Sequence, residues 1–346
     1  MQLYGKTMTR REIEQCLGRI EQIGGLQHCR LTGGKAEGVE QVQVRTGAGL
    51  TFEINVSRGM DIGLAEYCGT SLTWLSPNGI VHPAYWQGES TSWLQTAVGG
   101  LVMTCGLTQV GSPCNDDPEN LSLHGDAHQL PAELLRCEGE WQGDEYLMTV
   151  KGRIRQSRIF GENVTLARTI RSKIGENRIE IDNVVEKGGF SETPFMLLYH
   201  FNFGFPLMTG ETEIHFPSRK VIARDNEIPV MDCAQWPEPQ KNFHERVYYH
   251  EDLITENGTA TAVIHQPHFP VGNETRPLTV RLIWRTENLP RLVQWKMPGE
   301  GVYVLNLEPA NCHVEGRVAE RNRGTLQMLQ PGEVRHYNLA VDINEN

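Results

Sequence analysis

The sequence lacks the features of several large protein classes. No apolar stretch approaches the roughly 18 residues of a membrane span, and no Lys- or Arg-rich run occurs. The first residues do not follow the basic-then-apolar plan of a secretory signal. With 32 Lys and Arg against 43 Asp and Glu, the formal net charge is −11. We therefore expect a soluble cytoplasmic protein that binds neither nucleic acid nor a membrane.

Common cofactor and catalytic motifs are also missing. The eight cysteines include no C-x-x-C pair, so neither a zinc ribbon nor a dithiol redox centre is expected. The chain has no G-x-G-x-x-G, no complete G-x-x-x-x-G-K-[ST] and no G-x-S-x-G, and His244-Glu245 and His250-Glu251 lack the second histidine of H-E-x-x-H. Dinucleotide enzymes, P-loop proteins, α/β-hydrolases and zincins are disfavoured. We expect no cofactor and no bound metal.

What is present indicates an all-β protein. Of the 346 residues, 39% are hydrophobic and 22% charged, which suits a globular chain with a sizeable core. After residue 39 the hydrophobic period is two in many short runs: 52–56, 145–151, 164–170, 178–182, 194–203, 279–284, 292–296, 302–308 and 334–341. This pattern predicts a large antiparallel β-sandwich rather than βαβ units.

The N-terminal segment has a different pattern. The spacing of the apolar residues in 9–23 predicts one amphipathic helix. Thr9 and Glu12 form its capping box, and Gly24-Gly25 ends it. We expect two parts, an N-terminal helical appendage over 1–38 and a single sandwich domain over 39–346. Two stretches, 74–118 and 225–252, are interpreted as long functional loops because they are rich in Trp, His and Gly.

The strand at 194–203 holds the first candidate site residues. Alternation places Phe195, Leu197, Tyr199, Phe201 and Phe203 on one face, which we assign to the core. His200 and Asn202 then share the other face with Met196 and Leu198. Polar side chains at such positions are hydrogen-bonded or face a ligand, because an unsatisfied buried polar group costs about 1–3 kcal/mol. A core histidine satisfied by backbone is the alternative for His200.

The strand at 302–308 ends on a candidate base. Glu308 precedes Pro309, which is expected to end the strand pairing, so the carboxylate is placed at a strand exit. A solvated glutamate is the simpler interpretation. Inside a cleft, desolvation would instead raise its pKa towards the range that a general base needs.

Two further motifs lie in the first half of the chain. His124 and His128 have a spacing that a metal site can use, but no third ligand is identifiable. The segment Ser57-Arg58-Gly59-Met60-Asp61 offers a guanidinium with a carboxylate three residues later. A local ion pair at a bend explains this segment equally well.

Together these motifs resemble the aldose 1-epimerase (galactose mutarotase-like) superfamily, and more narrowly a bacterial branch of it. In that branch the segments S-R-G-M-D, L-H-G, H-F-N and L-E-P occur in the order found here, and the resemblance covers residues 39 to 343. The family is a large β-sandwich with its sugar site on one sheet face. The resemblance therefore implies a sugar as the small-molecule partner.

Carried over by motif, the resemblance assigns roles to individual residues. Glu308 matches the catalytic base and His200 the general acid, whereas His124 and Arg58 match sugar-binding positions. Asp61 matches the narrower branch alone. Asn202 and Lys296 are further substrate-binding candidates, because the alternation of side chains along their strands predicts that they face the cleft. Asp126 and Tyr199 replace a glycine and an asparagine of the better-known galactose mutarotases, and Asp225 is a candidate for their sugar-contacting aspartate.

The expected activity is interconversion of the anomers of a free sugar by acid and base ring opening, within carbohydrate metabolism. Two alternatives stay open: a sugar-binding protein without turnover, and a metal-dependent sugar isomerase or epimerase that uses His124, His128 and His200. With Arg58 and Lys296 as the only basic residues named for the cleft, a neutral sugar is favoured over a phosphorylated one.

Overall fold

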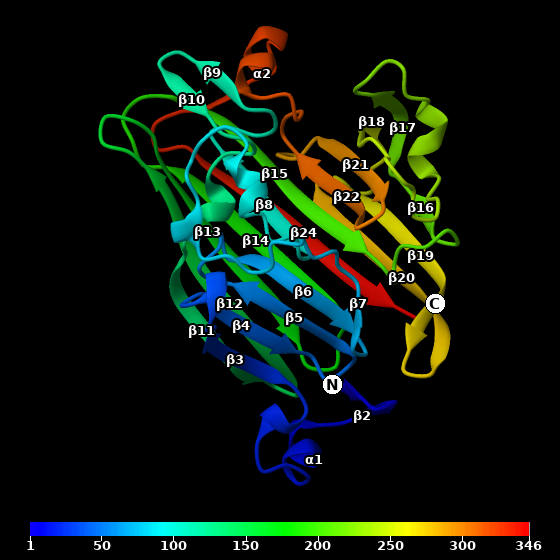
Figure 1. The fold of residues 1–346 in the computed structure, drawn as a ribbon. Helices are drawn as coiled ribbons and strands as arrows, with labels where there is room; N and C mark the ends of the chain where they lie inside the picture. The colour runs from blue at the N-terminus through cyan, green and yellow to red at the C-terminus, as the bar shows by residue number, and fades with distance from the viewer. Residues whose placement is uncertain (346) are drawn as a thin grey trace.

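Two large antiparallel sheets pack face to face to form the body of the molecule (Figure 1). The computed structural model describes residues 1–345. Every strand pair within the two sheets is antiparallel, and hairpins connect many consecutive strands. The predicted β-sandwich is confirmed.

The larger sheet has twelve strands and carries the candidate site. In spatial order its main path is β17 (Ser218–Ala223), β18 (Arg246–Leu253), β21 (Arg291–Gly299), β22 (Val302–Ala310), β15 (Thr193–Gly204), β8 (Val102–Leu107), β6 (Asp61–Tyr67), β5 (Leu50–Asn55), β4 (Glu40–Arg45) and β3 (Gly25–Arg30). Two short strands lie off this path: β7 (Thr70–Ser71) pairs with β6, and β23 (Gln327–Leu329) pairs with β15. The runs predicted around 52, 194, 292 and 302 all fall in this sheet.

The second sheet has eight strands. Its order is β11 (Glu133–Gln142), β12 (Glu145–Ser157), β13 (Asn163–Lys173), β14 (Arg178–Lys187), β24 (Val334–Asn344), β20 (Glu274–Arg285), β19 (Thr259–Val271) and β16 (Glu213–His215). Small elements complete the fold: hairpins β1 (Gln2–Leu3) with β2 (Lys6–Thr7) and β9 (Cys114–Asp116) with β10 (Glu119–Leu121), and helices α1 (Arg10–Glu14) and α2 (Arg317–Arg323). Short 3₁₀ turns lie at 20–22, 34–36, 83–85, 92–95, 127–129 and 230–234.

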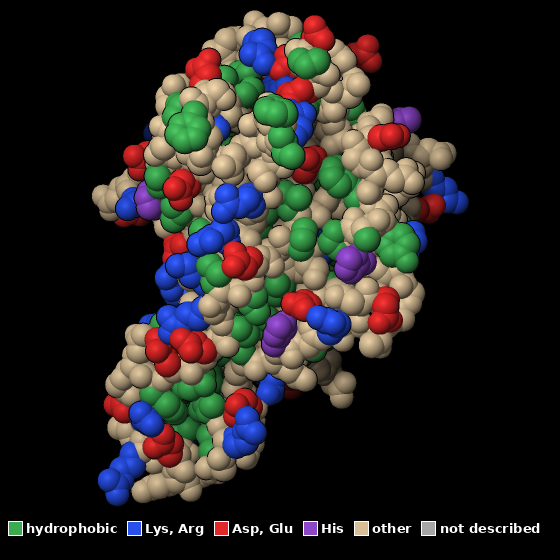
Figure 2. All heavy atoms as spheres, turned by 90° about the vertical axis from the view of Figure 1, so that its left-hand side faces the viewer, with side chains coloured by type: hydrophobic (Ala, Val, Ile, Leu, Met, Phe, Trp, Pro, Cys, Tyr) green, Lys and Arg blue, Asp and Glu red, His purple; other side chains and the backbone are tan. Residues whose placement is uncertain are grey.

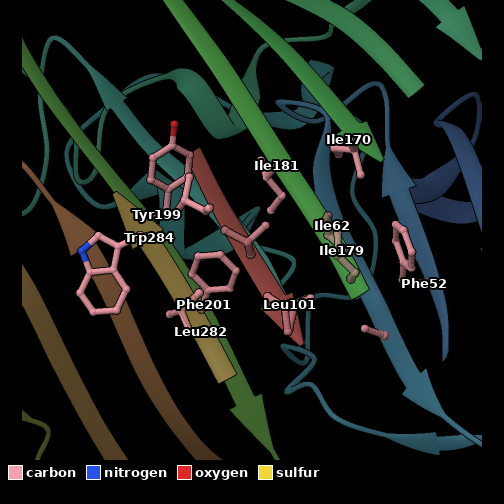
Figure 3. Close-up of a cluster of buried hydrophobic side chains, with 14 of the residues drawn as sticks. Phe52, Ile62, Leu101, Ile170, Ile179, Ile181, Tyr199, Phe201, Leu282 and Trp284 are labelled. Atoms are coloured by element: carbon pink, nitrogen blue, oxygen red, sulfur yellow. The ribbon is translucent and has the colours of Figure 1, made fainter. Parts of the chain in front are cut away.

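The main core fills the space between the two sheets. Figure 3 shows side chains of both sheets meeting there, with Tyr199 and Phe201 of β15 on one side and Ile181, Leu282 and Trp284 on the other. The five β15 residues assigned to the core by alternation, Phe195 to Phe203 at every second position, all belong to this cluster. The opposite face of β15 therefore points away from the core, as predicted for His200 and Asn202.

The N-terminal helix is much shorter than predicted. The capping box of Thr9 and Glu12 forms, but α1 ends at Glu14, and residues 20–22 make a separate 3₁₀ turn. Gly18 lies in the predicted helix interior, where glycine costs about 1 kcal/mol relative to alanine. Arg19 is extended, with φ −149° and ψ 142°. A single buried residue, Ile13, anchors α1, so packing does not compensate for the glycine.

Some segments interpreted as appendage or loop belong to the large sheet. Strand β3, at residues 25–30 of the predicted appendage, pairs along its length with β4. The stretch 74–118 contains β8, and 225–252 contains the start of β18. All six β8 residues are buried, so the strand lacks the alternation of a half-buried strand. This is why β8 was not recognised from the sequence.

The outer surface carries charges of both signs. Figure 2 views the left-hand side of Figure 1, where Lys and Arg side chains run down the face with Asp and Glu beside them. Pairs between neighbouring strands include Lys173 of β13 with Glu145 of β12 at 2.8 Å, and Arg153 of β12 with Glu133 of β11 at 3.6 Å. Within residues 1–345, no helix has the length and apolar character needed to cross a membrane.

Candidate active site

A cavity of about 390 Å³ lies on the face of the large sheet that points away from the core. Its floor comes from adjacent strands: Val247 of β18, Val293 and Trp295 of β21, Glu308 of β22, His200 of β15 and Met103 of β8. Trp74, Trp93, Leu94, Leu123 and His124 from the loop segments 74–98 and 121–130 complete the wall next to β8. The volume suits a small organic molecule.

His200 and Glu308 meet at the centre of this floor. Nε2 of His200 lies 3.2 Å from Oε1 of Glu308, and both side chains are almost fully buried. Glu308 is not at a strand exit, because β22 continues to Ala310 and Pro309 pairs with Leu292. The expectation of a solvated carboxylate is therefore wrong.

Two asparagines behind His200 fix the protonation of its ring. Asn202 donates its amide hydrogens to Gly100 O and His200 O, so its Oδ1 faces Nδ1 of His200 at 2.9 Å. Asn306 lies 2.8 Å from Nδ1 through its Nδ2, but its two amide hydrogens are accounted for by Phe201 O and Asn202 Oδ1. Nδ1 must therefore supply the hydrogen of its contact with Asn202. The lone pair of the neutral ring is then on Nε2, facing Glu308.

This arrangement places one proton between the two groups. A carboxylate facing a nitrogen lone pair at 3.2 Å would be repelled, so either Glu308 or Nε2 carries a proton. Burial raises the pKa of Glu308 well above its usual value, and the Glu245 carboxylate adds to this effect. Burial lowers the pKa of His200 to about 4, although the hydrogen bond that the ring donates to Asn202 acts in the opposite direction. Both pKa shifts favour the uncharged pair, in which the proton is on Glu308 and Nε2 of His200 carries a lone pair.

His124 reaches the cavity from a tightly constrained turn. Its φ is +56°, in the left-handed region that is uncommon for residues other than glycine. The backbone is held by bonds from Gly106 N to His124 O and from His124 N to Gly111 O. A Cβ at Gly125 would lie 2.4 Å from Gln109 O, so only glycine fits after His124. The His124 ring packs edge-on against His200 with centroids 5.6 Å apart, and burial lowers the pKa of His124 to about 3.

Arg58 and Asp61 lie outside the cavity, which corrects their predicted placement. Arg58 is fully buried and donates to Val81 O at 2.8 Å and Thr96 O at 2.7 Å, so it holds the segment that carries Trp93. Asp61 is also buried and accepts bonds from Thr104, His128 and Arg168. Neither side chain is accessible to a ligand. These backbone and long-range partners could not be identified from a five-residue motif.

Asn202 and Lys296 are likewise not at the cavity surface. Asn202 is fully buried behind His200. Lys296 lies on the face of β21 opposite Val293 and Trp295, where it donates to the carbonyl oxygens of Asp232 and Gln235. The odd-numbered residues Val293 and Trp295 of β21 face the cavity, so Lys296 belongs to the opposite face of the strand. Asp225 pairs with Arg224 at 3.0 Å and is half exposed, outside the cavity lining.

The structure adds lining residues that the sequence did not indicate. Glu245 and Arg224 form an ion pair at 3.2 Å, and Trp295 Nε1 donates to Glu245 at 2.7 Å. Trp295 also lies 6.1 Å from the His200 ring, and Trp93 lies 6.3 Å from it. Trp295 shares a strand face with Val293, so correct parity on the run 292–296 would have found it. Glu245 precedes β18 and gave no such signal.

His128 is buried beside the site rather than in it. Its Nδ1 lies 2.7 Å from Asp61 Oδ2, and burial lowers its pKa to about 4. In the described part of the chain, no three His, Cys, Asp or Glu residues are grouped closely enough to hold a metal ion.

Comparison with known families and structures places the fold. Residues 36–343 match the model of a family described as a domain of unknown function, DUF4432. No curated protein matches the sequence.

Several solved structures share the architecture. A proposed aldose 1-epimerase from Klebsiella pneumoniae subsp. pneumoniae MGH 78578 has a TM-score of 0.81 at 23% identity, with 92% of this chain and 83% of that chain covered. A galactose 1-epimerase from Lactobacillus acidophilus NCFM has a TM-score of 0.56 at 12% identity, with 93% and 99% covered. A galactose mutarotase-like protein from Clostridium acetobutylicum has a TM-score of 0.56 at 11% identity, with 94% of this chain and 100% of that chain covered. At these identities the similarity concerns the fold, and it confirms the galactose mutarotase-like sandwich.

Proposed function

We propose that this chain, which belongs to the DUF4432 family, is an isomerase of the aldose 1-epimerase type that interconverts the anomers of a free sugar. The observation that carries the proposal is the contact between His200 Nε2 and Glu308 Oε1, 3.2 Å apart on the floor of the cavity. Ring opening of a cyclic sugar needs one base and one acid close together, and these two residues supply both. The names of the fold neighbours agree with this chemistry.

The reaction proceeds through the proton that the pair shares. Transfer of this proton from Glu308 to Nε2 of His200 creates a carboxylate base and an imidazolium acid. The carboxylate takes the proton of the C1 hydroxyl, a carbonyl forms at C1, and the bond from C1 to the ring oxygen breaks. The ring oxygen takes the proton from Nε2. Rotation about the C1–C2 bond and reversal of these steps give the other anomer, and the pair regains its original proton.

The surroundings of the pair support this role. Asn202 and Asn306 hold the His200 ring with Nε2 towards the cavity, and the raised pKa of Glu308 and lowered pKa of His200 keep the resting pair uncharged, with its proton on Glu308. His124 lines the cavity next to His200 and is suited to bind a sugar hydroxyl.

The test is exchange NMR between α and β anomers across a panel of free sugars, with wild-type protein and Glu308→Gln. We expect at least one sugar to exchange faster than in buffer, and the variant to lose about 10²–10⁴-fold because the base is gone. Glu256→Gln is the matched control, since Glu256 is exposed and outside the cavity. This control should keep wild-type exchange.

Other outcomes would support a different function. If no sugar exchanges faster but one binds by calorimetry, a sugar-binding protein without turnover is the better description. If activity depends on a stoichiometric metal in protein purified without a histidine tag, the metal-dependent isomerase is supported and the proposed acid–base pair is wrong.

A further inference from the structure

We infer that the substrate is a 6-deoxy sugar, in which a methyl group replaces the hydroxymethyl group of the parent hexose; this rests on the proposed function. The inference comes from the unequal chemistry of the two halves of the cavity. The His200–Glu308 pair divides the floor, because β22 and β15 lie between β21 and β8.

The half beside β18 and β21 carries polar groups at its rim. Arg224 and Glu245 line it and pair with each other, and Glu245 also accepts from Trp295 Nε1. Arg224 uses Nε and Nη2 for Asp225 and Glu245, and within residues 1–345 its Nη1 has no hydrogen-bond partner. This half therefore offers a donor and a carboxylate to sugar hydroxyls.

The half beside β8 is mainly apolar. Met103 lies directly across from His200 in the strand pairing, and Trp93, Leu94 and Leu123 line the wall above it. Met103 and Trp93 belong to a hydrophobic cluster against which Leu123 packs, and Val247 and Val293 extend this cluster under the other half.

In that wall, the side chains of Ser76 and Asn78 already donate hydrogen bonds to backbone carbonyl oxygens. Ser76 Oγ donates to Ala97 O at 2.5 Å. Asn78 Nδ2 donates to Leu94 O and Ala97 O, both at 2.9 Å. His124, the hydroxyl of Ser112 and the indole Nε1 of Trp93 remain at this side, and Nδ1 of His124 and Nε1 of Trp93 have no hydrogen-bond partner within residues 1–345. Among the described residues, no Asp, Glu, Lys or Arg side chain lines this half, whereas Arg224 and Glu245 line the other.

Covalent geometry decides which sugar carbons enter each half. The ring oxygen is bonded to C1 and to C5, and C5 carries C6. With Glu308 at the C1 hydroxyl and His200 at the ring oxygen, C5 and C6 lie on the β8 side of the pair, and C2 lies on the β21 side. C6 therefore approaches Met103, Trp93 and Leu123, where a methyl group gains apolar contact and a hydroxyl would give up its hydration among mainly apolar side chains.

The test compares matched sugars that differ only at C6. Values of kcat/KM for anomer exchange are measured for D-fucose against D-galactose, L-rhamnose against L-mannose, and D-quinovose against D-glucose. We expect the 6-deoxy member to exceed its parent by about tenfold or more in the series that the cavity accepts, since such pockets discriminate by roughly 10–200-fold. Equal or better values for the parent in every accelerated series overturn the inference. If no sugar is accelerated, the proposed function itself fails, and the inference fails with it.

Two variants separate this preference from a general effect on catalysis. Leu123→Gln adds a hydrogen-bonding group to the apolar half and should bring the ratio of 6-deoxy to parent kcat/KM closer to one. Val247→Thr makes a comparable change in the other half and should leave that ratio unchanged, whatever it does to each absolute rate. A ratio that responds to Val247→Thr and not to Leu123→Gln contradicts the assignment of the two halves.

Discussion

At the scale of single residues, the proposed acid–base role of His200 depends on side chains that do not line the cavity. Asn202 and Asn306 are fully buried, yet they determine which ring nitrogen carries hydrogen and which faces Glu308. Both asparagines act as positioning residues. Asn202 was predicted to bind substrate, because strand parity gives the face of a residue but not its depth below the surface.

The first prediction concerns the titration of His200. We expect a neutral ring with hydrogen on Nδ1 at pH 6 and a midpoint near pH 4, because burial disfavours the imidazolium. Below that midpoint both members of the pair are protonated, so the base is lost and kcat/KM falls. Imidazole ¹⁵N–¹H spectra between pH 3.5 and 8, alongside the pH profile of kcat/KM, measure both. A midpoint near the ordinary 6.5 would mean that the ring is solvated.

At the scale of elements, one arginine holds the wall of the cavity in place. Arg58 follows β5 and precedes β6, and its guanidinium binds carbonyl oxygens on either side of the 82–95 segment. Burial lowers the pKa of Arg58 to about 10, which still leaves it charged at neutral pH. In this arrangement Arg58 supports the segment that carries Trp93 and does not line the cavity in which it was predicted to contact a sugar.

The second prediction follows from the hydrogen bonds of Arg58 to Val81 O and Thr96 O. Arg58→Met should destabilise the fold by about 1–3 kcal/mol for each carbonyl left unpaired, as measured by urea unfolding. Hydrogen exchange should become faster over 81–97, and KM should rise more than kcat falls, because the acid–base pair is untouched. Arg58→Lys, which keeps a charge and donors, should recover part of the protection. A KM defect with unchanged stability and exchange would restore the direct sugar-binding role.

Elements differ in how far the sequence could predict them. The alternating runs gave correct strands, and β15 was predicted with both of its faces. Fully buried β8 has no alternation to recognise, and the α1 region was overextended because its apolar period continues past Gly18. His200, Glu308 and His124 were found through their motifs. Arg224 and Glu245 were missed because their importance comes from strands that only the fold brings together.

At the scale of the whole molecule, buried histidines link stability to pH. Burial lowers the pKa of five of them: to about 3 for His124, to about 4 for His128, His200 and His250, and below its ordinary value for His313. Unfolding would restore the ordinary value near 6.5, so the unfolded chain binds more protons at these sites between about pH 6.5 and 4. Their contribution to stability is complete above pH 6.5 and is lost as the pH falls.

The third prediction is a stability that decreases on acidification. Glu308, Asp126 and Glu53 act in the opposite direction, because burial raises their pKa values and the folded state keeps their protons. The unfolded chain therefore gains about five protons on the histidines and loses about three from the carboxyl groups. The difference of about two protons corresponds to about 3 kcal/mol of unfolding free energy per pH unit between pH 6 and 5. Urea unfolding at pH 7, 6 and 5 measures this slope.

A variant of His250, which lies outside the cavity, measures the contribution of one histidine to this pH dependence. His250 is buried between Ser218 and Gln294 and stacks on Phe216. His250→Gln removes one titrating group and should reduce the slope by about 1.4 kcal/mol per pH unit. An unfolding free energy that is equal at pH 7 and pH 5 in the wild-type protein would contradict the linkage.

Strand β24 has a consequence for the order in which the molecule is completed. It lies in the interior of the eight-stranded sheet, between β14 and β20, although it follows every other strand in the chain. During synthesis the strands before it leave the ribosome first, and the facing edges of β14 and β20 stay without a partner until residues 334–344 emerge. Exposed edges of this kind invite pairing with other chains. The eight-stranded sheet thus closes from its middle, and we expect the nascent chain to be prone to aggregation until β24 has emerged.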